Sequence, residues 1–262
     1  MSNLFRDLAE SFKRPDHWLY SSWLGVITKY RKTYLGLFWI FVPPMVYIWG
    51  IGWFVGMINP VNVRPFMAHV GVGFIAFRLL TSVMNDSTVV FAQYQTYIND
   101  GNLRLTDYLL GVLARALIYF VLAMPVLLVA MLMSANFEPA GIPGSFLGLL
   151  VVVINLFFYS VILGLLGARF PDASEVIGSA TLFLFLVTPI VWYPTAAPAG
   201  TLHGMLMRVN PFHHLIAAIR APLTDEVLEP LTYYYLAGMT VVGLVVAVVA
   251  YRKYARRVPI WI

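Results

Sequence analysis

Three cations and several aromatic rings within residues 29–39 offer the clearest chemistry in this sequence. The cations are Lys29, Arg31 and Lys32, and the rings are those of Tyr30, Tyr34, Phe38 and Trp39. Lysine and arginine stay with phosphate head groups, while tyrosine and tryptophan favour the boundary between lipid and water. A long apolar run begins directly after the cluster. We therefore interpret residues 29–39 as the point where the chain turns from a membrane surface into the bilayer.

The preceding segment, residues 16–30, has helical periodicity. One stripe holds Trp18, Leu19, Trp23, Val26, Ile27 and Tyr30, and the opposite side holds Asp16, His17, Ser21, Thr28 and Lys29. This pattern is typical of an amphipathic helix that lies in the membrane interface. The alternative is a cytosolic tail with incidental aromatic residues, and the apolar run that follows favours the interfacial helix.

Composition indicates an integral membrane protein. The chain has 262 residues, is 60% hydrophobic and 11% charged, and has a mean hydropathy of +0.80, whereas soluble domains average about 25% charged residues. A spanning helix needs about 20 mostly apolar residues. Six runs meet this need, at residues 35–57, 66–90, 108–133, 146–168, 176–193 and 233–249. We predict an all-α fold with a single transmembrane domain over residues 1–262.

Particular residues modify two of these spans. Pro43 and Pro44 must kink the first span or break it into two pieces. Gly52 and Gly56 would allow close helix contact. In the second span, Arg78 and an acidic residue two turns later, Asp86, share a face and are too distant to pair directly. An arginine inside a span is costly and normally faces a protein interior or a wet cavity.

Two connecting segments are also distinctive. Residues 93–107 are polar and contain a turn signal at residues 99–102, with Thr106 or Asp107 as N-cap of the third span. Residues 195–230 are too polar to span but keep apolar residues at helical spacing on both sides of residues 210–211. This pattern predicts two short amphipathic or re-entrant helices.

The distribution of cations predicts the topology. With six spans, the positive residues divide very unequally, which by the positive-inside rule makes both termini cytoplasmic. The cytoplasmic side receives Arg6, Lys13, Arg14, Lys29, Arg31, Lys32, Arg104, Arg115, Arg169, Arg252, Lys253, Arg256 and Arg257; the other side receives Arg64, Arg208 and Arg220. The net charge of +5 is thus interpreted as topology and not as nucleic-acid binding.

The sequence gives little support to catalysis. It has no GxxxxGK[ST] phosphate loop and no HExxH motif, so the chain is not itself a P-loop ATPase. His213 and His214 are adjacent, and neighbouring helical side chains point about 100° apart, so they make poor joint metal ligands. We expect no catalytic residue, no metal site and no cofactor in this chain.

Aromatic residues make up 15% of the chain. Most are expected at the interface and in helix packing. A minority would line a conduit, because aromatic faces stack on sugar rings without fixed charges that trap a moving polymer. The candidates are Tyr30, Tyr34, Phe38, Trp192 and Tyr193.

Four stretches, in this order and spacing, together resemble the membrane subunits of type-2 ABC exporters of bacterial polysaccharides. Residues 29–39 are similar to the R-x-R-x-x-x-L-G-x-x-W entry signature, which Arg31, Gly36 and Trp39 match. Residues 113–119 and 169–172 are similar to the capsule-export branch. Residues 210–223 resemble the late N-P…R segment through Asn210, Pro211 and Arg220, with an ending similar to O-antigen exporters. One departure is at residues 100–104, where capsule permeases often carry prolines.

The resemblance implies a homodimer with two copies of a separate ABC ATPase subunit, which binds ATP and Mg. It implies that residues 16–30 form a gate helix at the bacterial inner membrane, where Lys29, Arg31 and Lys32 meet the phosphate of a lipid-linked polysaccharide. It also implies a periplasmic gate over residues 195–230, with room for a periplasmic adaptor. ATPase coupling would use residues 93–107, specifically Asn99, Asp100, Gly101, Asn102, Leu103 and Arg104.

Three alternatives stay open. The first is an O-antigen exporter in place of a capsule exporter. The second is a membrane enzyme that acts on polyprenyl-linked sugars, which would share the basic aromatic interface. The third is a type-2 ABC exporter of small molecules or drugs, a group that commonly carries a large extracellular domain or distinct cytoplasmic helices.

Overall fold

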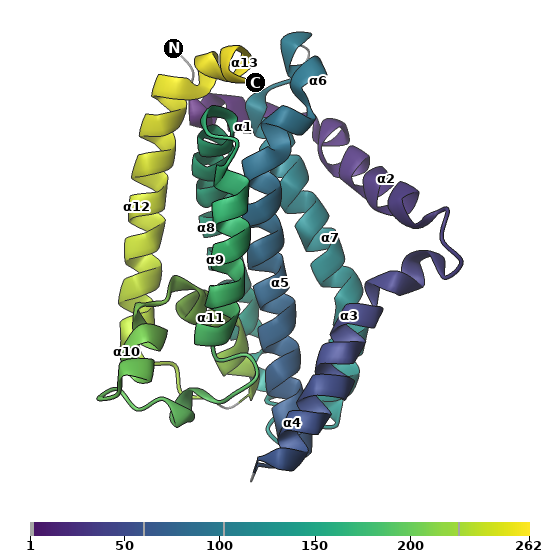
Figure 1. Cartoon of the computed structure of the whole chain (residues 1–262), viewed down its shortest axis with the longest axis vertical. Helices are drawn as coiled ribbons and strands as arrows, with labels where there is room; N and C mark the ends of the chain where they lie inside the picture. The colour runs from purple at the N-terminus through teal and green to yellow at the C-terminus, as the bar shows by residue number, and fades with distance from the viewer. Residues whose placement is uncertain (1–2, 60, 102, 225) are drawn as a thin grey trace.

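The structure is a computed structural model that describes residues 3–59, 61–101, 103–224 and 226–262 (Figure 1). Within these ranges the chain forms helices joined by turns, with no strand. The helices are α1 (Leu4–Phe12), α2 (Leu19–Tyr30), α3 (Val42–Met45), α4 (Trp53–Ile58), α5 (Val63–Gln93), α6 (Gln95–Asn99), α7 (Leu105–Leu132), α8 (Ile142–Arg169), α9 (Ala173–Val187), α10 (Leu202–Val209), α11 (Pro211–Thr224), α12 (Pro230–Tyr254) and α13 (Val258–Trp261).

Among the described residues, four helices are long and apolar enough to cross a membrane. They are α5, α7, α8 and α12, which contain 31, 28, 28 and 25 residues. Each coincides with a predicted span: the second, third, fourth and sixth. The prediction of an all-α membrane protein is confirmed at this level.

The predicted first and fifth spans form shorter apolar helices. The first run is broken before Val42, as the two prolines require: a 3-10 turn over Gly36–Ile40 ends there, and Pro43 and Pro44 stand in the first turn of the helical stretch Val42–Ile58, which opens with α3. A π-helical segment, Val46–Gly52, then leads into α4. The fifth run yields α9, of 15 residues, which ends at Val187 and not at the predicted residue 193. The structure therefore confirms four of the six predicted spans by length.

Helix α5 is the centre of the bundle. Of its most apolar 18-residue stretch 83% is buried, against 11% for the corresponding stretch of α12. α5 packs mainly against α7, α8 and α11. The close approach of α8 to α5 needs a glycine, since a Cβ at Gly167 of α8 would lie 1.8 Å from the carbonyl oxygen of Thr88 on α5. Gly52 and Gly56, which were expected to allow close helix contact, face the start of α5. A Cβ added at Gly52 would lie 3.4 Å from a Cα atom of that helix, and one at Gly56 would lie 3.3 Å from another.

The N-terminal arm, residues 4–41, lies partly against the bundle and partly away from it (Figure 1). Helix α1, which the sequence analysis did not predict, is held by a 2.7 Å hydrogen bond between Ser11 and Thr106. Ser22 Oγ donates to the Gly111 carbonyl at 2.9 Å, and eight residues later on each helix the Tyr30 and Tyr119 rings meet. α2 therefore runs alongside the first half of α7, in the same direction.

This packing differs from the predicted stripe of α2. Val26 of the stripe is buried, but so is Ser22, which lies outside the stripe, whereas Leu19 and Trp23 of the stripe are 47% and 40% exposed. The reason is that α2 uses a small polar side chain, Ser22, to approach the α7 backbone closely, and its larger apolar side chains point outward. The interfacial position of α2 stays a prediction.

The two described ends of the chain lie at the same end of the bundle, near α6 and α13 (Figure 1). The opposite end contains α10 and α11. These are the two short helices predicted within residues 195–230, and Asn210 separates them as expected.

Candidate functional site

The basic and aromatic segment 29–39 forms the bend at the tip of the N-terminal arm (Figure 1). The chain leaves α2 after Tyr30 and turns at Gly36, whose φ is +53° and is adopted without strain only by glycine. Arg31 and Lys32 are exposed, and Tyr34 is fully exposed. The structure therefore directs most of the predicted entry residues away from the helix bundle.

Lys29 and Tyr30, by contrast, contact the bundle. The Lys29 Nζ atom lies 5.6 Å from the ring centroid of Tyr30 and 5.8 Å from that of Tyr119 on α7. The Arg78 guanidinium carbon lies 5.7 Å from the same Tyr119 ring, and the Tyr30 and Tyr119 rings meet edge to face at 6.4 Å. Both cations are thus held by aromatic faces, which attract positive charge. The sequence analysis did not select Tyr119.

A polar stripe runs along the otherwise buried α5. Arg78, Ser82, Asn85 and Asp86 recur at helical spacing, and each is only partly buried, whereas most of their neighbours are fully buried. A partly accessible polar stripe in a membrane helix is expensive unless it faces water, another polar surface or a substrate. The stripe is thus the best candidate for a functional surface on α5.

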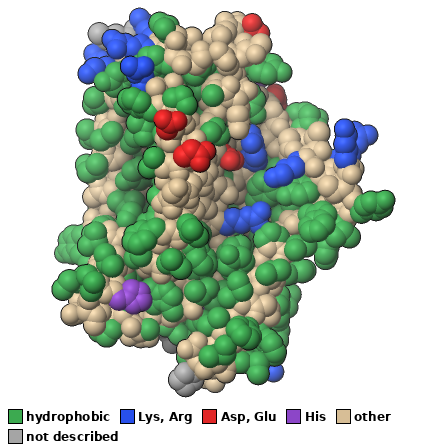
Figure 2. Space-filling view, viewed as in Figure 1, with side chains coloured by type: hydrophobic (Ala, Val, Ile, Leu, Met, Phe, Trp, Pro, Cys, Tyr) green, Lys and Arg blue, Asp and Glu red, His purple; other side chains and the backbone are tan. Residues whose placement is uncertain are grey.

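The charges beside this stripe are unbalanced. Asp86 interacts electrostatically with both Arg115 and Lys29. In the part of the chain that the structure describes, none of Lys29, Arg78, Arg115 or Asp86 forms a direct ion pair. Figure 2 shows Lys and Arg side chains gathered on the face that adjoins the arm. Of these cations, Lys29 is exposed, whereas Arg78 and Arg115 are partly buried.

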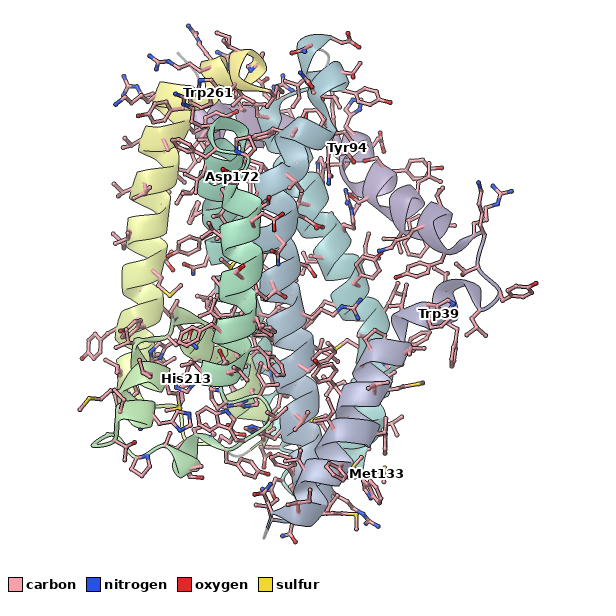
Figure 3. The ribbon with its side chains drawn as sticks, in the orientation of Figure 1. Trp39, Tyr94, Met133, Asp172, His213 and Trp261 are labelled. Atoms are coloured by element: carbon pink, nitrogen blue, oxygen red, sulfur yellow. The ribbon has the colours of Figure 1, made fainter. Side chains whose placement is uncertain are left out.

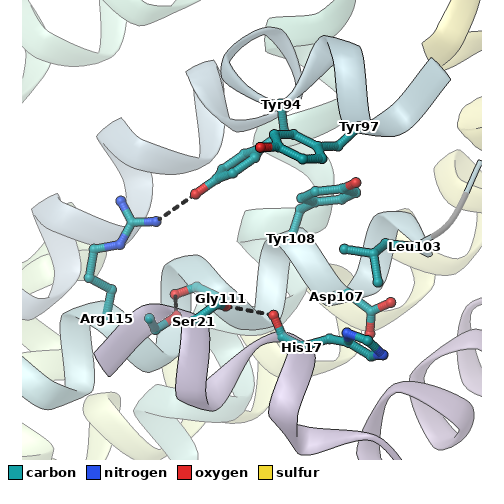
Figure 4. A pocket seen from close by; sticks show the side chains of 10 residues that line it. His17, Ser21, Tyr94, Tyr97, Leu103, Asp107, Tyr108, Gly111 and Arg115 are labelled. Atoms are coloured by element: carbon teal, nitrogen blue, oxygen red, sulfur yellow. Dashed lines mark hydrogen bonds between the residues drawn. The ribbon is translucent and has the colours of Figure 1, made fainter. Parts of the chain in front are cut away.

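A cavity of about 150 Å³ lies between α2 and the start of α7 (Figure 4). Three tyrosine rings line it: Tyr94, Tyr97 and Tyr108. The ring centroids of Tyr94 and Tyr108 lie 5.2 Å apart. Arg115 also lines it and donates to the Tyr94 hydroxyl at 3.4 Å, a long and weak hydrogen bond. The Tyr108 hydroxyl is buried and has no hydrogen-bond partner among the described residues. A polar group in the cavity would therefore find an unused hydrogen-bonding partner there.

The predicted coupling segment contains α6, which ends at Asn99, and a turn in which Gly101 has a φ of +71°. Asn102 lies outside the described residues. The predicted N-cap is wrong: the cap is Arg104, and Asp107 stands at the third helical position, where its Oδ2 atom accepts from the Arg104 amide at 2.9 Å. Arg104 also forms an ion pair with Glu10 of α1. The segment is thus connected directly to the N-terminal arm.

At the opposite end, Asn210 and Pro211 open α11. The Asn210 Oδ1 atom accepts from the Phe212 amide at 3.0 Å, and its Nδ2 atom donates to Thr188 Oγ1 at 2.8 Å. Asn210 therefore caps α11 and connects it to the end of α9. His213 lies at this end of the molecule, far from Trp261 (Figure 3).

Arg220 is 1% exposed and lies in a buried ionic network. Its Nε atom contacts Glu226 Oε2 at 3.0 Å, and its Nη1 atom donates to the Pro189 carbonyl at 2.6 Å. The other carboxylate oxygen of Glu226 lies 2.6 Å from Nδ1 of His69 on α5, whose Nε2 lies 3.0 Å from the Trp192 carbonyl oxygen. Arg220 thus does not extend toward a lipid head group. It joins α5, α11 and the segment after α9.

His69 and Glu226 were missed by the sequence analysis. A histidine within the second predicted span was the available signal, since ionisable residues in spans usually have partners. Burial alone would favour the protonated form of Glu226, but the Arg220 guanidinium and the hydrogen bond to His69 outweigh it and lower the pKa of Glu226 to about 2. A second pair, Arg208 with Glu229, lies nearby and uses two guanidinium nitrogens, at 3.0 and 2.5 Å.

The five predicted conduit aromatics are not brought together. Tyr30, Tyr34 and Phe38 lie on the arm, whereas Trp192 and Tyr193 lie at the α10–α11 end. There the Tyr193 ring packs between Phe66 and His69, with centroids 5.3 and 4.5 Å away. Trp192 and Tyr193 also line a cavity of about 260 Å³.

Among the described residues there is no group of three or more side chains suited to hold a metal ion. No protein-family model and no curated protein matches this chain. The function proposed below therefore rests on the geometry and on the sequence resemblance.

Proposed function

We propose that this chain is the permease subunit of an ATP-driven ABC exporter that moves a lipid-linked capsular polysaccharide across the bacterial inner membrane. The observation that carries this proposal is the partly accessible polar stripe of α5, with the cations and tyrosines beside it. A polymer rich in hydroxyl groups needs polar partners at membrane depth, and aromatic faces let it slide. An O-antigen exporter would use the same surface and stays the closest alternative.

In this proposal the arm is the entrance. Arg31 and Lys32 at its exposed bend attract the phosphate of the lipid carrier, and Lys29 at the end of α2 receives it near the bundle. The proposal places both termini in the cytoplasm, because cations concentrate at the end that contains them. It also requires the shorter helices Val42–Ile58 and Ala173–Val187 to cross the bilayer with the four long ones.

Energy comes from a separate ATPase subunit that contacts the coupling segment, residues 93–107. Arg104 pairs with Glu10, and Ser11 bonds to Thr106, so a movement of this segment reaches α1 and then α2. ATP would drive export because its binding and hydrolysis favour different positions of the arm. The ionic network of Arg220, Glu226 and His69 would keep the external end closed between cycles.

Purification with the candidate ATPase tests the proposal. We expect a P-loop subunit to copurify and ATP hydrolysis to appear only in the complex. The double variant Arg31→Gln, Lys32→Gln should cause lipid-linked polysaccharide to accumulate in the cytoplasm. Turnover of a polyprenyl-linked sugar by the isolated chain would instead establish the enzyme alternative, and unaltered export would remove Arg31 and Lys32 from the mechanism.

A further inference from the structure

The cavity between α2 and the start of α7 has a charged group of each sign in its wall (Figure 4). Asp107 and Arg115 both line it and stand eight residues apart on α7, which is about 12 Å along the helix axis. Gly111, which adds no side chain, lies between them on the same side of the helix. The ion pairs found within the described chain do not include one between Asp107 and Arg115. The cavity therefore has a negative end and a positive end.

Two residues of this cavity contain a buried polar atom without a hydrogen-bond partner. Tyr108 is 7% exposed, and its hydroxyl has no partner among the described residues. Asp107 is 4% exposed; its Oδ2 atom accepts from the Arg104 amide, but its Oδ1 atom has no partner in the same part of the chain. A buried polar group without a partner costs free energy, and such a group in a native structure calls for an explanation. The wall of the cavity thus has hydrogen-bonding capacity that these residues do not use.

The geometry points to a binding site for one uncharged sugar ring in this cavity. Its volume of about 150 Å³ has room for about ten water-sized atoms, since a water needs about 10–15 Å³, and a hexose is of similar size. Sugar hydroxyls donate to Asp107 and accept from Arg115, whereas a simple cation or anion is repelled at one end. The rings of Tyr94, Tyr97 and Tyr108 offer apolar faces to the C–H groups of the sugar. A small rotation of the Tyr108 ring brings its hydroxyl to the ligand.

This site joins the N-terminal arm to the coupling segment. His17 and Ser21 of the arm form its exposed side, and Tyr94 and Tyr97 belong to residues 93–107. A bound ring contacts both parts and holds them together. The inference rests on the proposed function for the source of the ring, the exported glycan, and for the ATPase that meets residues 93–107. Binding itself needs neither. Failure to find an ATPase subunit would withdraw the exporter and keep the site, and failure to bind sugar would withdraw the site and keep the exporter.

Calorimetric titration of the purified full chain with glucose, galactose and N-acetylglucosamine tests the site. The detergent must carry no sugar head group, because such a head group would compete for the cavity. We expect saturable binding of at least one of the three sugars, and a bound sugar should protect the arm from protease. Sorbitol is the matched control ligand, since it has the hydroxyl groups of glucose but no ring face to stack on tyrosine. Absence of binding by all three sugars, or equal binding of sorbitol, would overturn the inference.

Two variants separate binding from folding. Tyr108→Phe should weaken sugar binding about fivefold, the loss of one neutral hydrogen bond. Without sugar, its unfolding temperature should be unchanged or higher, because the hydroxyl that it removes has no partner among the described residues. Arg115→Gln should weaken binding about tenfold, the loss of one charge-assisted contact, and it carries the test if Tyr108→Phe does not fold. Tyr235→Phe is the control, since it removes the same group beside His214 at the α10–α11 end. Equal affinity in wild type, Tyr108→Phe and Arg115→Gln would overturn the inference.

Discussion

Two polar regions of the molecule differ in how their charges are neutralised. At the α10–α11 end, Arg220 and Arg208 each contact a carboxylate, and His69 uses both ring nitrogens. Where the arm meets the bundle, the exposed Lys29 and the partly buried Arg78 lie beside the Tyr119 ring, and Arg115 lies beside Tyr94. The acid near them is Asp86, which interacts electrostatically with Lys29 and Arg115. Both regions contain arginine at membrane depth, but only one neutralises it with its own residues.

Under the proposed function, this difference separates a structural role from a role in transport. Where the chain supplies its own counter-charges, removal of one partner leaves a buried uncompensated charge and destabilises the fold. Where counter-charges are missing, the same removal costs the fold little and costs the ligand a partner. The following experiments test this division, starting from the largest expected effect.

Removal of the Glu226 carboxylate should have the largest effect on stability. Glu226→Ala leaves Arg220 buried without its partner, which typically costs about 3–5 kcal/mol. The measurement is the unfolding temperature of the detergent-solubilised chain. Glu229→Ala is the matched control: its carboxylate is 34% exposed against 19% for Glu226, so its loss should cost clearly less. Similar losses would contradict the division.

Arg78→Gln should show the opposite profile. Because Arg78 has no ion-pair partner among the described residues, we expect the free energy of unfolding to change by about 1 kcal/mol or less. Export of polysaccharide in cells should nevertheless fall about tenfold, in line with the loss of one charge-assisted contact. If Arg78→Gln unfolds readily yet exports normally, Arg78 has a structural role and no role in transport.

Acid should loosen the α10–α11 end. Burial, with the charge of His214 and Arg220 nearby, lowers the pKa of His213 to about 3 from its usual 6.5. Below pH 6.5, His213 therefore binds a proton in the unfolded chain but stays neutral in the folded chain. The free energy of unfolding should fall as the pH drops from 6.5 toward 3. Between pH 7 and 4.5 the unfolding temperature should decline more steeply in the wild type than in His213→Gln. The variant keeps a shallower decline because the pKa of His214 is also lowered, chiefly by burial. Parallel curves would contradict this prediction.

The smallest effect is expected at the contact between α2 and α7. Ser22 is 3% exposed, and its one hydroxyl proton is shared between the Gly111 carbonyl at 2.9 Å and the Trp18 carbonyl at 2.6 Å. Ser22→Ala should therefore cost about 1 kcal/mol or less, the usual net value of one hydrogen bond. Protease sensitivity of the arm should rise with it. Ser21→Ala is the control, because Ser21 is exposed and bonds only to the backbone at the start of its own helix.

Local sequence signals predicted the local structure well. Pro43 and Pro44 break the first apolar run, Gly101 forms the predicted turn, and the four long helices begin and end close to the predicted positions. Each of these features depends on residues within one or two turns of each other. Backbone sterics and hydropathy therefore suffice to predict them.

Long-range pairing was not predictable in the same way. His69 and Glu226 are 157 positions apart, and no local sequence pattern around either residue indicates that the two are partners. The packing of α2 on α7 was not predicted for a related reason, since apolar periodicity predicts a face but not whether lipid or α7 covers it. Arg78 was recognised as unusual, but its position beside Tyr119 needed the packing of α5 on α7.

The hydrogen bond from the Tyr251 hydroxyl to Asp7, at 2.9 Å, joins residues 244 positions apart. α1 is synthesised first, but this contact must wait until α12 has left the ribosome. The arm that carries α2 therefore completes its docking only at the end of synthesis. A nascent chain truncated before Tyr251 should lack this last attachment of the arm, although the contacts of Ser11 with Thr106 and of Ser22 with Gly111 can already form.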